Sequence, residues 1–426
     1  MPGCGKRNKI GTDRFFMKIS ANPFKWQSVF LILPVLLIVH GCSHEMDGTP
    51  KVDSDPCANA LGNGSEIISG PAGPEGGDFD QVFRSLEVDP ANPNAVTLGT
   101  ERNGIVKTTD GGGTWRRLRT GMRHSTNAYP EVWDITVSPF HPSLVIAATA
   151  DSPGPVAGDA PSSVACIYRS TDGGDTWARS NCGLSNSYAL CVRFDSRDPA
   201  GVVLGIGGGR ATFSALSGRH FDGALMFSND AGLNWIAAFT PIGVGENVFW
   251  ILRACGSGTS RFVTFGFCPD DSSKNLGFLR SEDGGKTWNP FASPLRTQLI
   301  AEFDVSIDGR ILYAVERDAF SAHKSTDGGS SWNTIAAPAN GPIRVSPSHP
   351  NVVLFCEGEK TYCSTDGLQS WDLVLTAMGR VDDVEFAPSK TEVVYLATEG
   401  YHVYKSTDSG ASWFHLVSLR NAGVLN

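Results

Sequence analysis

The sequence predicts an all-β protein, a seven-bladed β-propeller of four-stranded antiparallel blades, on three observations. An eight-residue pattern, Ser/Thr-x-Asp-x-x-x-(Ser/Thr/Asn)-Trp, returns seven times in the 426 residues. From one pattern aspartate to the next the steps are 62, 58, 53, 44, 39 and 42 residues, about the length of one four-stranded blade. Between the copies, no segment carries the cap and the 3.6-residue apolar period of a helix.

Each copy of the pattern, called the Asp box below, predicts a tight turn between the third and fourth strands of a blade. Its aspartate can accept hydrogen bonds from backbone N–H groups of its own turn, and its glycines supply positive φ angles. The tryptophan should open the fourth strand and pack between blades with its indole N–H satisfied. The sixth box has Leu368 where the others have glycine, so its turn is expected to be looser or differently shaped. The aspartates expected to be structural are Asp110, Asp172, Asp230, Asp283, Asp327, Asp366 and Asp408.

The residues ahead of each box supply the other three strands. Before the first box, apolar runs alternate with Pro/Asn and Gly turns in FRSLEVDPANPNAVTLGTERNGIVKTTD, which predicts three short strands. The seventh unit ends near Ser418, and closing the ring against the first blade would remove exposed sheet edges. We therefore expect the propeller to cover residues 77–420, followed by a short tail at 421–426.

Residues 1–41 predict a targeting segment. Lys18 and Lys25 precede an apolar run from Val29 to Val39, which is too short to span a membrane and has the length of a signal-peptide core. The start of translation, Met1 or Met17, stays open. Residues 42–76 are rich in Gly, Pro, Ser and Asp and predict a flexible tether.

The end of that run, Val39-His40-Gly41-Cys42, resembles the lipobox of bacterial lipoproteins. The resemblance implies that Cys42 is diacylated and becomes the mature N-terminus, anchored at the cell envelope. Ser43 after the cysteine resembles the outer-membrane sorting pattern. Plain secretion is the alternative.

Charge and cysteine content exclude some functions. Without residues 1–41 the chain would carry 29 basic and 43 acidic residues, a net charge of about −14, which leaves no basic footprint for nucleic acid. There is no C-x-x-C spacing and no cysteine next to a histidine, so neither a metal nor a cofactor is indicated. Eight cysteines besides Cys4 and Cys42 suit an exported protein. Cys356–Cys363 and Cys166–Cys182 could each form a disulfide across a hairpin, Cys57, Cys191, Cys255 and Cys268 are unassigned, and the connectivity stays open.

Function is expected in the loops opposite the boxes, which ring the mouth of the central channel. Three of these loops are long, 149–164, 207–224 and 268–277, and they would wall one side of the mouth on blades two to four. Paired carboxylates there could hydrolyse a glycoside and arginines could clamp an anionic sugar, although a solvated loop is the simpler role for each. The catalytic candidates are Asp222, His220, Asp151, Asp270 and Asp271, and the binding candidates are Arg123 and Arg210. Other polar residues of these loops are Glu101, Arg102, His124, Asp159, Arg219, Glu316 and Arg317.

Trp133 and Trp250 lie outside the box scheme, at the starts of inner strands. Each is a candidate sugar-stacking platform near the mouth, and core packing is the alternative.

The boxes, together with the VDPANPNAV-type turn before them, resemble those of BNR/Asp-box repeat proteins over residues 81–420. That family includes sialidases, xyloglucan-cleaving hydrolases, sortilin-type receptors and photosystem II assembly factors. Phe83-Arg84-Ser85-Leu86 only partly matches the sialidase motif, so no catalytic role is carried onto it. The single seven-bladed layout resembles the assembly factors.

The resemblance implies a non-catalytic module, most simply a monomer, that binds an envelope protein or a glycan. The alternative is a glycoside hydrolase of sialidase or xyloglucanase type, with its site at the channel mouth.

Overall fold

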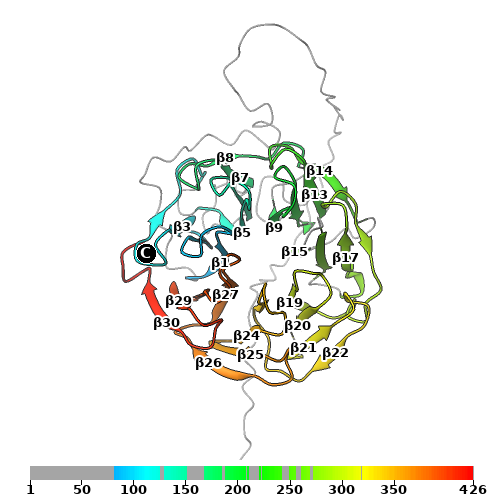
Figure 1. The fold of residues 1–426 in the computed structure, drawn as a ribbon. Coiled ribbons are helices and arrows are strands. Elements are labelled where there is room, and N and C mark those ends of the chain that lie inside the picture. The colour runs from blue at the N-terminus through cyan, green and yellow to red at the C-terminus, as the bar shows by residue number, and fades with distance from the viewer. Residues whose placement is uncertain are drawn as a thin grey trace, which may run out of the picture. The chain divides into compact units, whose positions relative to one another are not determined.

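In the computed structural model, the described residues are 81–124, 129–150, 167–184, 188–207, 209–210, 220–221, 223–241, 249–255, 261–268, 272–317 and 319–425. They form seven four-stranded antiparallel sheets arranged in a ring (Figure 1). The predicted fold class, a seven-bladed propeller of four-stranded blades, is confirmed. The described residues contain no helix long and apolar enough to cross a bilayer.

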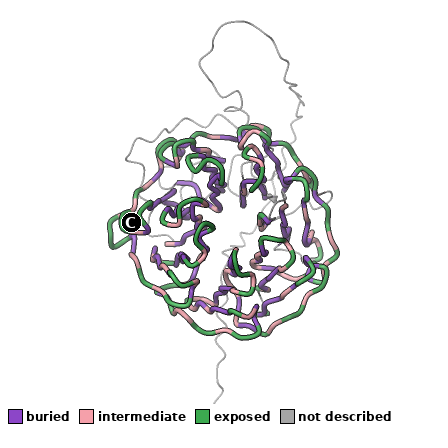
Figure 2. The backbone as a smooth tube through the Cα atoms, viewed as in Figure 1, coloured by how far each residue is buried: buried purple, intermediate pink, exposed green. Residues whose placement is uncertain are grey.

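Every blade uses four strands in chain order, and blade 3 also carries a two-stranded hairpin. Blade 1 consists of β1 (Phe83–Val88), β2 (Val96–Thr100), β3 (Ile105–Thr108) and β4 (Arg116–Arg117), and blade 2 of β5 (Glu131–Val137), β6 (Val145–Ala150), β7 (Ile167–Ser170) and β8 (Ala178–Arg179). Blade 3 consists of β9 (Ala189–Phe194), β10 (Val202–Ile206), β13 (Ala224–Ser228) and β14 (Ile236–Phe239), and its hairpin of β11 (Gly209–Arg210) and β12 (His220–Phe221). Blade 4 consists of β15 (Phe249–Cys255), β16 (Arg261–Phe267), β17 (Gly277–Ser281) and β18 (Asn289–Pro290). The last three blades are β19 (Ile300–Val305), β20 (Leu312–Glu316), β21 (Ser321–Ser325) and β22 (Asn333–Ile335); β23 (Ile343–Val345), β24 (Val353–Glu357), β25 (Lys360–Ser364) and β26 (Asp372–Thr376); and β27 (Val381–Phe386), β28 (Val394–Thr398), β29 (His402–Ser406) and β30 (Phe414–Ser418). Buried positions follow the first three strands of each blade, whereas the fourth strands and the turns are largely exposed (Figure 2).

The Asp boxes form the predicted turns between third and fourth strands. In the fourth box, Asp283 accepts hydrogen bonds from Thr287 N (2.9 Å), Thr287 Oγ1 (2.7 Å) and Ser281 Oγ (2.8 Å). The other six box aspartates accept the equivalent set from the first and seventh box residues. The carboxylates are thus used locally to hold the turn.

The sixth box does not have the looser turn that its leucine led us to expect. Leu368 takes a positive φ of 67°, and its N–H donates to Ser364 Oγ at 2.8 Å, as the glycine does in the other boxes. In those six boxes a Cβ on that glycine would come within 2.8 Å of an apolar side chain of the preceding blade. Leu368 is 2% exposed and packs in one cluster with Tyr313 and Phe355. Its side chain therefore occupies space that a neighbouring blade fills elsewhere, and this burial offsets the backbone strain.

The box tryptophans pack between blades, as predicted. Trp177 and Trp235 are 4% and 3% exposed, and their indole N–H groups donate to the carbonyls of Leu118 (3.2 Å) and Ser180 (2.8 Å) in the preceding blades. Each of these side chains ties its blade to the one before it.

The disulfide predicted between Cys356 and Cys363 does not form, and both thiols are free and buried. Their hairpin pairs Glu357 with Lys360, so Cys356 lies opposite Thr361 and Cys363 lies opposite Leu354. The turn is centred one residue earlier than a cross-strand pair of these cysteines requires.

Of the other cysteines, Cys191 and Cys255 are also free, and Cys268 is buried. Cys182 is disulfide-bonded, and its predicted partner, Cys166, lies outside the described residues, as does Cys57.

Among the described residues, each sheet takes its four strands in chain order, and no strand is exchanged between the first and last blades. Blade 1 packs directly on blade 7 through a shared apolar cluster that includes Phe83 and Tyr401. The last residues join it: Leu425 is fully buried there, and Arg117 Nε donates to the carbonyl of Val424. The residues predicted only as a tail thus help to hold the two ends of the ring together.

Candidate functional site at the channel mouth

The two faces of the ring differ in which loops they carry. Box turns bond to the turn between the first two strands of the same blade, as in Gly111 N to Asn94 O (2.8 Å) and Gly367 N to Asn351 O (2.9 Å). These turns make up one face, the box face. The loops between second and third strands, and the connections from blade to blade, therefore lie on the opposite face, called the mouth face below.

The inner strands, the first of each blade, surround the axis (Figure 1). Because no strand pairs with them on the axis side, their N–H groups there need other acceptors. Carboxylates of the preceding blade supply several. Asp134 Oδ2 accepts from Val192 N (2.9 Å), Asp304 Oδ2 from Val345 N (2.8 Å) and Asp383 Oδ2 from Leu86 N (3.1 Å).

Three arginines link these carboxylates into ion pairs across blades. Arg193 lies 2.5 Å from Asp134. Arg253 lies 2.6 Å from Glu302 and 3.5 Å from Asp304. Arg344, whose side chain is 7% exposed, contacts Asp383 (2.7 Å), Glu385 (3.1 Å) and Glu302 (3.5 Å). Blades 4 to 7 thus share one partly buried charge network.

Carboxylates outnumber arginines in the inner strands by eight to four. Removal from water raises the pKa of Glu87 to about 8 and that of Glu385 to about 7. Burial also raises the pKa values of Asp304 and Asp383, whereas Arg253 and Arg344 together overcome burial and lower the pKa of Glu302. The channel therefore holds more acid groups than its own cations neutralise.

A second set of charges, called the mouth cluster, lies where the inner strands begin. The Arg84 guanidinium lies over the Trp133 ring, 5.0 Å from its centroid, and pairs with Glu101 (3.1 Å) and Glu131 (3.9 Å). Trp133 Nε1 donates to Glu131 at 2.8 Å. Burial raises the pKa of Glu131 to about 7.

Blade 7 adds Asp382 and Arg380 to the mouth cluster. Asp382 accepts a hydrogen bond from Phe83 N (3.0 Å), pairs with Arg380 (3.3 Å) and interacts electrostatically with Arg84. Its pKa is also raised by burial, to about 7. The mouth cluster therefore joins blades 1, 2 and 7.

Of the binding residues that the sequence suggested, the structure brings Trp133 into the mouth cluster, together with the loop residue Glu101. Trp250 is 4% exposed, donates from Nε1 to Ile206 O (3.0 Å) and meets Phe239 edge-on, which favours the packing alternative. Arg123 is half-buried, and its N–H donates to the Tyr168 hydroxyl at 3.0 Å.

The hairpin of blade 3 pairs the backbones of Arg210 and His220, whose side chains are outside the described set. The remaining catalytic candidates, Asp151, Asp222, Asp270 and Asp271, also lie outside the described residues.

The sequence analysis does not identify the charged residues of the inner strands as site residues, although the sequence carries a signal for them. Five of the seven inner strands place a charged residue at the next-to-last position, between apolar residues: Glu87, Arg193, Asp304, Arg344 and Glu385. Because side chains alternate along a strand, equivalent positions in a ring of blades line one level of the channel.

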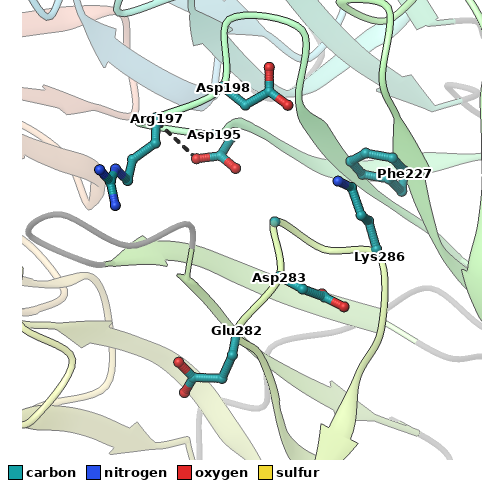
Figure 3. A pocket seen from close by; sticks show the side chains of 8 residues that line it. Asp195, Arg197, Asp198, Phe227, Glu282, Asp283 and Lys286 are labelled. Atoms are coloured by element: carbon teal, nitrogen blue, oxygen red, sulfur yellow. Dashed lines mark hydrogen bonds between the residues drawn. The ribbon is translucent and has the colours of Figure 1, made fainter.

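A hollow of about 440 Å³ lies on the box face, between blades 3 and 4 (Figure 3). Its carboxylates are largely engaged in turns: Asp195 accepts from Arg197 N (2.8 Å) and Asp283 holds its box. Lys286 lies over the Phe227 ring, 5.5 Å from its centroid. The hollow joins turn residues and does not include the mouth cluster.

Solved structures with a similar fold are a GH74 xyloglucanase from Xanthomonas campestris and YCF48 from Cyanidioschyzon merolae. The xyloglucanase is 16% identical with a TM-score of 0.57 over 79% of this chain and 55% of its own. The YCF48 structure is 15% identical with a TM-score of 0.52 over 77% of this chain and 94% of its own. A further structure, of YCF48 bound to a D1 peptide, is 13% identical with a TM-score of 0.49 over 79% of this chain and 93% of its own.

The chain thus spans just over half the length of the xyloglucanase, and at these identities the likeness shows the fold alone. Neither a family model nor a curated protein matches the sequence.

Proposed function

We propose that this protein is a non-catalytic binding module that receives a cationic group of an envelope protein in its central channel. The excess of carboxylates over arginines in the inner strands carries this proposal. Ionised carboxylates removed from water are costly unless a cation pairs with them. A lysine or arginine side chain of the partner would supply the missing charge next to Glu385 and Glu87, which retain raised pKa values in the unbound protein.

The mouth cluster is better suited to binding than to hydrolysis. Glycoside hydrolysis needs two carboxylates free to act on either side of a sugar. Glu101 and Glu131 instead share Arg84, and both side chains are less than one-tenth exposed. Within the described part of the chain, the hollow of about 440 Å³ lies on the box face and not at the mouth cluster.

Binding of peptides to the purified chain tests this proposal. We expect a lysine-rich peptide to bind, a glutamate-rich peptide of equal length not to bind, and affinity to fall as salt rises. The variant Glu87→Gln/Glu385→Gln should bind the lysine-rich peptide more weakly. Glu282→Gln, an exposed change on the box face, should not. Equal binding of both peptides, or an unaffected double variant, contradicts the proposal.

The hydrolase alternative is supported by one observation, the raised pKa of Glu131, because a general acid needs a carboxyl that stays protonated near neutral pH. A screen of plant and bacterial polysaccharides for released reducing ends tests it. Hydrolysis that Glu131→Gln abolishes in a normally folded variant would establish an enzyme in place of a binding module.

We also propose the lipid anchor, on the resemblance of the sequence around Cys42 to a lipobox. Cys42→Ala should move the protein from the membrane fraction to the soluble fraction, and Cys57→Ala should not. An unchanged distribution of the Cys42 variant would exclude acylation at this residue.

A further inference from the structure

Two histidines meet on the outer strands of blade 7, away from the channel. His402 begins β29 and His415 is the second residue of β30, the adjacent antiparallel strand. Their nearest ring nitrogens, Nδ1 of His402 and Nε2 of His415, are 3.1 Å apart. The ring of Tyr404 packs edge-on against His415, with centroids 5.0 Å apart. The two imidazoles are thus held with nitrogen facing nitrogen.

Such a pair can share one proton or bind one metal ion between the two nitrogens. Bonds of about 2.0–2.1 Å to nitrogens at this separation enclose roughly 100° at the metal. That angle lies between the square-planar value that copper prefers and the tetrahedral value that zinc prefers. The observed separation therefore suits chelation without movement of either strand.

The surroundings keep the imidazoles available as ligands. His415 is exposed and His402 is half-buried. A neutral imidazole is the form that binds a metal, and the exposed position of His415 leaves its ring accessible to a metal ion from solvent.

We propose that His402 and His415 form a two-histidine chelate for a divalent transition-metal ion, with Cu²⁺ bound more tightly than Ni²⁺ or Zn²⁺. Among the described residues there is no group of three or more histidine, cysteine or carboxylate ligands, so water or a group of another molecule completes the coordination. This site could not be predicted from the sequence, because its two ligands are thirteen residues apart and meet only through the pairing of β29 with β30.

Titration of the full chain with Cu²⁺, followed by calorimetry and by electron paramagnetic resonance, tests the proposal. We expect one site whose spectrum shows two coupled nitrogens, with an affinity that falls in acid because protons compete with the metal for the imidazole nitrogens. Removing a residue that only hydrogen-bonds to a metal ligand lowers affinity by about 10–100-fold. The variant His402→Ala/His415→Ala removes both ligands, so we expect it to lose at least that much affinity for Cu²⁺.

His349→Ala, which changes another histidine at the surface, is the matched control and should bind as the parent does. Comparable affinity in the double variant, or a spectrum with one coupled nitrogen, would mean that the pair shares only a proton. The single variants His402→Gln and His415→Gln guard against misfolding, because each keeps a polar side chain and removes one ligand.

Discussion

The box turns and the central channel both depend on carboxylates, with opposite effects on their protonation. In the boxes, hydrogen bonds from a neighbouring hydroxyl and N–H lower the pKa values of Asp327 and Asp366 to about 2. In the channel, burial raises the pKa values of Glu385 and Glu87 to about 7 and 8. The same functional group is stabilised as an anion where donors surround it in water, and destabilised where cations are too few.

The largest expected effect on stability comes from removing a cation from the channel. Arg344→Ala leaves Asp383, Glu385 and Glu302 without their shared partner, and we expect it to lower the free energy of unfolding by about 3–5 kcal/mol, measured by urea denaturation. The control is Arg116→Ala, whose pair with Asp175 is more than half exposed, and it should cost no more than about 1 kcal/mol. Equal losses would show that the channel pairs behave as surface pairs.

A second test concerns the one box without glycine at its fifth position. Leu368→Gly relieves a positive φ but removes a buried side chain, so we expect a net loss of about 2–5 kcal/mol in the free energy of unfolding. A more stable variant would show that backbone strain outweighs packing at this turn.

A third test removes one box carboxylate. Asp283→Ala deletes the acceptor of three hydrogen bonds in a mostly exposed turn, and it should lower the free energy of unfolding by about 1–3 kcal/mol. Thermal unfolding measures the loss, and peptide binding in the channel should stay unchanged, because the box lies on the other face. Lost binding in the folded variant would assign the box a functional role.

The smallest expected effect is a change in the free energy of unfolding with pH. Glu385 has its pKa raised from 4.5 to about 7, so the folded state holds a proton that the unfolded state releases between these values. Its contribution to stability is therefore complete below pH 4.5 and is lost as the pH rises through 7. Urea denaturation at intervals from pH 5 to pH 8 should show this decline, and Glu385→Gln should make it less steep, since Glu87, Glu131 and Asp382 contribute in the same direction. A rise in stability over the same range would reverse the assigned shift.

The sequence predicted the parts of the fold that depend on local chemistry. The Ser-x-Asp start of a box, its glycines and its tryptophan act within eight residues, so the blade count and the turns followed from them. It did not predict the ion pairs of Arg344, because their partners come from two other blades and depend on how the strands face the axis. The pairing of Cys356 with Cys363 was wrong because the hairpin turn is centred one residue earlier, which places each cysteine two residues away from the position opposite the other.

The candidate site was less predictable than the fold. The long loops that the sequence favours lie partly outside the described residues, whereas the mouth cluster is built largely on strand residues such as Arg84 and Glu131. The sequence identifies Trp133 as a candidate because it lies outside the box scheme. Its contact with Arg84 could not be predicted, because that contact depends on the packing of blade 2 against blade 1.

Closure of the ring without strand exchange also bears on how the chain folds. Every sheet pairs strands that follow one another along the chain, so nearly all backbone pairing can form over short sequence separations, which favours rapid formation of individual blades. The exception is the junction of the two ends, where Phe83 N reaches Asp382 across 299 residues. Loop-closure entropy makes that contact costly to form early. We therefore expect blades to assemble in series and the joining of blade 7 to blade 1 to be the late, rate-limiting event.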